Sequence, residues 1–190
     1  LRSHTERFEQ GGIDEAYLDL SSRVDDLDQA ANLARTIMQE VLDSEDLSCS
    51  VGVAPNKMLA KIGSDFRKPF GLTVISEEGA KEFLSPLGVR KIPGVGPRTE
   101  EMLLDLGIRT IGQLAAADPD RLARQLGILG KRLYERAQGI DPSEVVVNYE
   151  TKSIGREVTF ERDIKDAAPI LQLMDGLAEE IHGELIECGF

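Results

Sequence analysis

The sequence lacks the features of a membrane, secreted or metal-knuckle protein. None of its 190 residues belongs to an apolar run of the ~18 residues that a transmembrane helix requires. The N-terminal region is charged and has no apolar segment like that of a signal peptide. The two cysteines, Cys49 and Cys188, lie far apart and away from any histidine cluster. We therefore expect a soluble, cytoplasmic protein with no membrane partner, in which both cysteines are small core residues.

Basic residues are also scarce. The chain has 34 acidic and 22 basic residues and a net charge of −12, whereas a nucleic-acid-binding protein usually carries a basic surface. The acids are dispersed along the chain and do not form a tail. Two explanations are open: adaptation to a high-salt cytoplasm, where dispersed surface acids favour solubility, or an ordinary acidic protein. The first predicts loss of folding in low salt.

The apolar content, 41%, is sufficient for one domain or for two to three small modules with a core. The first module, residues 1–75, shows a strand, helix, strand pattern. Alternation of apolar and polar residues predicts strands, and apolar spacing of three and four residues predicts helices. The expected strands are 13–20, 47–53 and 72–75, and the expected helices are 27–41, with Asp25 or Asp26 as N-cap, and a second that has Pro55 at its first position.

The pattern changes at residue 76. Residues 76–141 alternate short helical stripes with glycine turns, which predicts an all-helical module with a tight hairpin at 88–97 and a looser copy at 127–131. Residues 142–152 lack periodicity and are expected to be a linker. Residues 153–162 are expected to form a strand, and 170–185 a helix that ends at Gly189. We expect the third module, 153–190, to be truncated and both chain ends to belong to a longer protein.

Two adjacent carboxylates, Asp14 and Glu15, follow the glycine pair Gly11-Gly12. Carboxylate oxygens suit Mg²⁺, a hard cation that shares its ligands with substrate phosphates. Acidic pairs in turns commonly just face water, and consecutive side chains on a regular strand point to opposite faces. Both can therefore bind one metal cluster only if the backbone is irregular here, and the glycines allow that.

The wider sequence resembles the Y family of translesion DNA polymerases, in particular its DNA polymerase IV-like members. The resemblance covers nearly the whole chain in the family's order. It is carried by five segments: 13–19 (IDEAYLD), 49–57 (CSVGVAPNK), 68–72 (KPFGL), 92–96 (IPGVG) and 152–156 (KSIGR). The fold that it implies is an α+β palm portion with a mainly antiparallel sheet, an all-α helix-hairpin-helix thumb, and a truncated α/β little-finger start.

The resemblance implies that Asp14 and Glu15 are catalytic and are two of three carboxylates that bind two Mg²⁺ ions. The third ligand and most of the fingers would lie outside this chain, so we expect the fragment alone to be inactive. Lys68 corresponds to the family lysine that contacts the nucleotide phosphates. For Lys57 and Lys61, a solvated lysine face is the stronger alternative. Two departures, Phe70 and Gly12, loosen the match without removing a ligand.

The glycine hairpins resemble helix-hairpin-helix motifs, in which backbone N–H groups at a helix start bind a DNA phosphate. Glycines are also common helix caps, and the flanking cations favour the DNA interpretation. Arg156, interleaved with acids, is a weaker candidate. The expected DNA-binding residues are Lys91, Gly94, Val95, Gly96, Arg98, Gly130, Lys131, Arg132 and Arg156.

The function that the resemblance implies is error-prone, template-directed DNA synthesis in DNA repair and damage bypass, by two-metal nucleotidyl transfer. The expected partners are primer-template DNA, deoxynucleoside triphosphates and a sliding clamp that would bind a segment absent here. The alternative is a non-catalytic helix-hairpin-helix module that binds the DNA backbone, in which the acidic pair is structural. An aspartate-bearing strand upstream of Leu1 would favour the enzyme.

Overall fold

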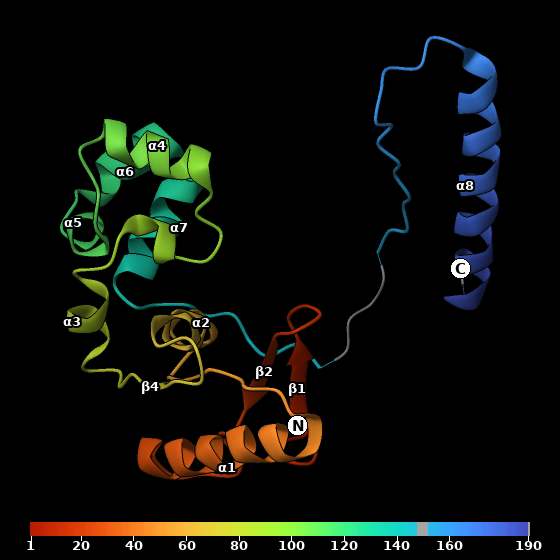
Figure 1. Ribbon diagram of the computed structural model, residues 1–190. Coiled ribbons are helices and arrows are strands. Elements are labelled where there is room, and N and C mark those ends of the chain that lie inside the picture. The colour runs from red at the N-terminus through yellow and green to blue at the C-terminus, as the bar shows by residue number, and fades with distance from the viewer. Residues whose placement is uncertain (148–151, 190) are drawn as a thin grey trace. The chain divides into compact units, whose positions relative to one another are not determined.

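The computed structural model describes residues 1–147 and 152–189, which belong to two compact units, Leu1–Val147 and Asn148–Phe190 (Figure 1). The first unit contains β1 (Arg7–Gln10), β2 (Ala16–Asp19), α1 (Leu27–Glu45), β3 (Val51–Val53), α2 (Lys57–Phe66), β4 (Leu72–Val74), α3 (Ala80–Leu84), the 3-10 helix η1 (Val89–Lys91), α4 (Pro97–Asp105), α5 (Ile111–Ala115), α6 (Pro119–Leu126) and α7 (Ile128–Ala137). The second contains α8 (Ala167–Glu187). No helix in the described residues is long and apolar enough to cross a membrane.

The strands form two separate ladders. β1 and β2 pair antiparallel as a hairpin with Arg7 opposite Asp19, whereas β3 and β4 pair parallel with Val51 opposite Leu72. The expected mainly antiparallel sheet is thus present in the hairpin, and the second ladder is parallel because α2 returns the chain across it. The α+β fold class is confirmed by the likeness to solved structures reported below.

The β3–β4 ladder is covered by a helix on each face (Figure 1). Val53 packs with Ala30 and Ala34 of α1, and neighbouring residues of a strand point to opposite faces. Gly52 therefore faces α2, where a Cβ atom would lie 1.9 Å from the carbonyl oxygen of Ala60. The close approach of α2 to the ladder depends on this glycine.

The N-terminal ends of the longer helices follow the capping rules in most cases. Asp26, one of the two expected caps of α1, accepts the N–H of Gln29 at 2.8 Å. The expectation that Pro55 begins the next helix was wrong, because α2 starts at Lys57 and its N-cap is Asn56. The asparagine side chain stabilises the first turn by accepting the N–H of Leu59 at 3.0 Å.

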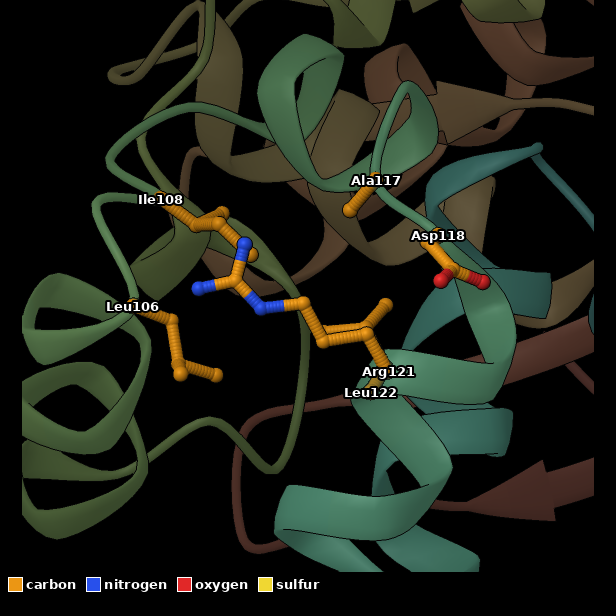
Figure 2. Close-up of a pocket in the computed structure, with 6 residues that line it drawn as sticks. All are labelled: Leu106, Ile108, Ala117, Asp118, Arg121 and Leu122. Atoms are coloured by element: carbon orange, nitrogen blue, oxygen red, sulfur yellow. The ribbon is translucent and has the colours of Figure 1, made fainter.

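The helical module, residues 76–141, surrounds a core of fully buried aliphatic side chains. Its members come from every helix of the module and continue into α2; the least exposed are Leu59, Leu84, Val89, Ile92, Leu103, Ile111, Leu114, Leu122 and Leu133. One surface cavity of about 70 Å³ lies where Arg121 of α6 extends toward Ile108, with Leu106 and Ala117 beside it (Figure 2). It is too small for a nucleotide, since ligand pockets usually measure ~300 Å³ or more.

Two expectations about the rest of the chain were wrong. Residues 153–162 are not a strand, because a strand requires a hydrogen-bonded neighbour and the described part of this unit offers none. Cys188 is exposed and Cys49 half-buried, so they are not core residues. The expected helix at 170–185 is confirmed as α8, which is followed by Gly189 with φ of 77°.

Candidate active site and nucleic-acid interface

Asp14 and Glu15 lie in the connection between β1 and β2 and not on a regular strand. The N–H groups of Gly11 and Gly12 both donate to the carbonyl oxygen of Glu15, at 2.8 and 3.3 Å, which closes the connection. The irregular backbone that two adjacent ligands require is therefore present. Asp14 is exposed, and the Glu15 side chain is 41% exposed, so both carboxylates are accessible.

An alternating row of charges extends from Glu15 along α2. The Glu15 carboxylate contacts the ammonium of Lys61. The same ammonium lies 3.1 Å from Asp65 Oδ2, and the other oxygen of Asp65 lies 2.6 Å from Lys68 Nζ. Lys61 and Asp65 are one helical turn apart, so they share a face of α2. Glu15 and the expected phosphate-binding lysine, Lys68, are thus joined through two intervening side chains.

The pKa values of Lys61 and Asp65, the two inner groups of this row, are each shifted in the direction that favours the charged form. Partial burial pushes the pKa of Lys61 down, but hydrogen bonds to Glu15 and Asp65 outweigh it and leave the pKa above its ordinary value. Partial burial pushes the pKa of Asp65 up, but hydrogen bonds from Lys68 and Lys61 leave it below its ordinary value. Lys61 and Asp65 are therefore both ionised at neutral pH.

Lys57 belongs to a second ion pair. Its ammonium lies 2.6 Å from Glu9 of β1 and 4.8 Å from the ring centre of Tyr17. The side chains of Lys57 and Lys61 are 17% and 24% exposed, so the alternative of a solvated lysine face does not describe them. Glu9 and Asp65 were missed by the sequence reasoning; the spacing of Asp65 to Lys61 and Lys68 could have indicated it, but nothing local indicates Glu9.

The fit of these residues to a metal rests on their donor chemistry. Asp14 and Glu15 supply carboxylate oxygens, the ligands that Mg²⁺ prefers, and Mg²⁺ commonly takes only one or two protein carboxylates and fills its shell with waters and substrate phosphates. Within residues 1–147 and 152–189, no group of three or more His, Cys, Asp or Glu side chains could hold a metal ion. The described residues therefore fit part of a metal site.

The first glycine hairpin precedes α4. Gly94 has a φ of +85°, a conformation that a residue with a Cβ rarely adopts. Val95 is buried, and its N–H donates to the carbonyl oxygen of Ile92 at 3.0 Å. Arg136 of α7, another residue that the sequence reasoning missed, donates to the carbonyl oxygen of Pro93 at 2.8 Å. The Arg136 side chain and the buried Val95 thus anchor the turn to the helical module.

Both hairpin helices begin without a side-chain cap. The N-caps of α4 and α7 are Gly96 and Gly127, and neither makes a side-chain hydrogen bond. By contrast, α1, α2, α5, α6 and α8 each have a side chain that accepts a first-turn N–H. The first N–H groups of a helix have no partner within it. Pro97 has no N–H, and the N–H of Gly130 donates to the carbonyl oxygen of Gly127 at 3.1 Å, so the remaining first-turn N–H groups of α4 and α7 are those available to an anion.

Exposed cations flank both hairpins: Lys91 and Arg98 at the first, Lys131 and Arg132 at the second. Gly130 is buried, as Val95 is, and a Cβ there would lie 2.3 Å from the Leu122 carbonyl oxygen. Gly130 allows α7 to pack closely on α6.

Arg156 lies in the second unit, beside α8. Its guanidinium contacts Glu184, and its Nε lies 3.5 Å from Glu180. The interleaved acids that the sequence shows near Arg156, Glu157 and Glu161, are not these partners.

Two family models match the chain. One, described as the impB/mucB/samB family, matches residues 1–65, and the other, described as the DNA polymerase-iota thumb domain, matches residues 90–141. DNA polymerase IV 2 of Methanosarcina mazei is 43% identical over 190 residues, which are 100% of this chain and 52% of that protein. The chain therefore spans about half the length of the curated relatives it matches.

Solved structures agree with these relatives. A Y-family DNA polymerase chimera, Dbh-Dpo4(243-245)-Dbh, superposes with a TM-score of 0.85 at 34% identity and covers 96% of this chain and 53% of the chimera. The insertion ternary complex of Dbh DNA polymerase superposes with a TM-score of 0.71 at 33% identity, over 96% of this chain and 54% of that one.

Proposed function

Because this chain belongs to the Y family of DNA polymerases, we propose that it supplies two catalytic carboxylates and the DNA-holding hairpins of a translesion polymerase. The observation that carries the proposal is the row on α2, which joins Glu15 through Lys61 and Asp65 to Lys68. Through it, the proposed metal ligand Glu15 and the proposed phosphate-binding Lys68, which have opposite charges, both contact side chains of α2. Nucleotidyl transfer needs both groups beside one substrate.

In the proposed mechanism, Asp14 and Glu15 would hold Mg²⁺. Two bound Mg²⁺ ions would supply activation of the primer 3′-hydroxyl and charge stabilisation of the leaving pyrophosphate. The other roles in this mechanism belong to side chains of this chain. Lys61 balances the charge of Glu15 and keeps that carboxylate beside the middle of α2.

Lys68 would bind the triphosphate of the incoming nucleotide. It has to leave Asp65 to do so. The Lys68 side chain is 58% exposed, and exposed ion pairs contribute only about 0–1 kcal/mol. A triphosphate carries several charges where Asp65 carries one, so the exchange favours the nucleotide.

The hairpins would hold the DNA backbone irrespective of base sequence. The open N–H groups at the starts of α4 and α7 suit phosphate oxygens, and the macrodipole of each helix adds to the attraction. Lys91, Arg98, Lys131 and Arg132 add charge to the same two places. Gly94 and Gly96 shape the first hairpin, whose turn Arg136 supports.

The proposed substrates are therefore primer-template DNA and deoxynucleoside triphosphates, and we propose the cytoplasm as the compartment. Recruitment by a sliding clamp stays a prediction, because it concerns a segment outside this chain. The subdomain limits 1–75, 76–141, 142–152 and 153–190 also stay predictions, with 1–75 as the catalytic palm portion.

Primer extension tests the proposal. In the complete polypeptide that contains this chain, Asp14→Ala and Glu15→Ala should each reduce extension with Mg²⁺ by at least about a thousandfold, which corresponds to about 4 kcal/mol of transition-state stabilisation. Asp25→Ala, a nearby exposed acid in the loop before α1, is the matched control. Extension by both site variants at the wild-type rate would contradict the proposal.

The same preparation distinguishes the alternative function. A non-catalytic DNA-backbone-binding module would bind duplex DNA with normal salt dependence and show no extension in the wild type. This alternative would rest on the hairpins alone, with their uncapped helix starts and exposed cations.

A further inference from the structure

The start of α2 is held from two directions. Asn56 caps the helix from within its own segment, through its Oδ1 and the N–H of Leu59. Asp141, which follows α7, caps it from the helical module, since its Oδ2 accepts the N–H of Met58 at 3.0 Å. A third bond runs the opposite way, from Asn56 Nδ2 to the carbonyl oxygen of Gly139 at 2.8 Å. We call Asn56, Met58, Gly139 and Asp141 the α2 clasp.

The chain beyond the clasp continues along the same elements. Lys57 donates to the carbonyl oxygen of Glu144 at 3.2 Å, and the N–H of Val146 donates to Glu9 of β1 at 2.7 Å. The Asp141 carboxylate is itself oriented by the hydroxyl of Ser143 at 2.6 Å. Residues 139–146 are thus bound to α2 and then to the hairpin that carries the proposed catalytic carboxylates.

The clasp supplies an orientation that apolar packing does not. The buried cluster is continuous across this junction, since Met58 and Leu59 of α2 belong to it together with Leu133 and Ala137 of α7. Apolar burial is non-directional, and at the clasp it is incomplete, because a groove of about 370 Å³ lies here with Asn56 and Asp141 in its wall. Hydrogen bonds depend strongly on angle, so the clasp can determine how the two parts are aligned.

We propose that Asn56 and Asp141 are positioning residues that align the DNA-holding hairpins with the charged row that runs from Glu15 to Lys68. The inference rests on the proposed function. Asn56 and Asp141 bind backbone groups of each other's segment and act through α2. Alignment matters because a displacement of ~1 Å at a reacting centre can reduce the rate ~100-fold.

Substitutions can separate the clasp from the helix cap. Asn56→Asp keeps an acceptor for the Leu59 N–H but replaces the donor to Gly139 with a second oxygen, which repels that carbonyl. Asp141→Ala removes the acceptor of the Met58 N–H, whereas Asp141→Asn keeps one and is the conservative rescue. Asp26→Asn, an acid–amide exchange at the N-cap of α1, is the matched control.

Two measurements on the complete polypeptide test the proposal. In primer extension, Asn56→Asp and Asp141→Ala should lower kcat about tenfold while the Kd for duplex DNA stays within about twofold, because the hairpins are intact. Asp141→Asn should restore most of kcat, and the α1 control should match wild type. In hydrogen exchange, amides of residues 137–141 should exchange about threefold faster in Asn56→Asp, with α1 unchanged.

Each contrary result overturns a defined part of the proposal. Faster exchange with unchanged kcat would show a clasp without a positioning role. A parallel loss of kcat and DNA affinity would show a general structural role. Unchanged exchange would show that the clasp does not restrain the junction. Absence of extension by wild type would contradict the proposed function instead, and the exchange measurement alone would then decide whether the clasp exists.

Discussion

The sheet region, residues 1–75, and the helical module, residues 76–141, hold their proposed functional groups in different ways. In the sheet region the groups are side chains located by ion pairs, such as Glu15 with Lys61, over a small cluster of Ala30, Ala34 and Val53. In the helical module they are backbone N–H groups and exposed cations over a large aliphatic core. The functional side chains of the sheet region therefore depend on ion pairs and on close backbone contact. The functional N–H groups of the helical module depend on the packing of its core.

The sheet region should be most sensitive where backbones touch. Gly52→Ala places a Cβ 1.9 Å from the Ala60 carbonyl oxygen, which forces α2 away from β3, and should cost about 3 kcal/mol or more in the free energy of unfolding. Urea denaturation measures it. Gly12→Ala is the control, since a Cβ there meets nothing within 4 Å. Equal stabilities of the two variants would refute the close contact.

The helical module should be most sensitive in its core. Leu114 is 0% exposed and Val53 is 9% exposed. Leu114→Ala should lower the free energy of unfolding by about 3 kcal/mol, and Val53→Ala by about half as much, because a larger buried side chain leaves a larger cavity. Urea denaturation of both variants measures these losses. A larger loss of unfolding free energy for Val53→Ala than for Leu114→Ala would contradict the greater dependence of the helical module on its core.

Local sequence patterns predicted those elements that are determined by interactions between residues close in the sequence. Alternation and helical spacing located β2, β3, α1 and α8, and the glycine turns located the hairpins at 88–97 and 127–131. The pattern failed at 153–162, where alternation was present but a pairing strand in the described residues was not. It also placed Pro55 inside α2, although Asn56 is a stronger N-cap signal.

The sequence predicted the candidate residues of the site better than the contacts that they make. The pair Asp14-Glu15 and its irregular backbone followed from two glycines. The partners Glu9, Asp141 and Arg136 could not be predicted, because each lies far along the chain from the group it contacts. Long-range pairing depends on the completed fold, which periodicity does not encode.

The ion pairs of the sheet region should make it acid-sensitive. Partial burial pushes the pKa of Glu9 up, but hydrogen bonds from Lys57 and Val146 outweigh it and leave the pKa below its ordinary value of 4.5. A lowered pKa stabilises the fold above pH 4.5 and the effect is lost as pH falls through the folded-state pKa. Glu9→Gln should cost about 1 kcal/mol at neutral pH and nothing in acid.

Unfolding of wild type and Glu9→Gln across a pH series measures this difference. Glu82→Gln, an exposed acid on α3 of the helical module, is the matched control. A Glu9→Gln difference that persists unchanged in acid would show that packing, and not the charge of Glu9, holds the pair.

The smallest expected effect concerns the exposed cations of the second hairpin. Lys131→Ala and Arg132→Ala should each reduce by about one the slope of log affinity for duplex DNA against log salt, because each removes one phosphate contact. Arg23→Ala, in the loop before α1, should leave the slope unchanged. Equal slopes for all three variants would remove the second hairpin from the DNA interface.

The parallel β3–β4 ladder has a consequence for the order of folding. Its strands and the intervening α2 form one short continuous segment, so closing their contacts costs little loop entropy. Contacts between residues close in sequence form faster than contacts between distant ones, and Val51 lies closer in sequence to its partner Leu72 than Glu15 does to Lys61. We expect β3, α2 and β4 to form before the carboxylate hairpin docks on α2, so that the hairpin assembles onto a template that already exists.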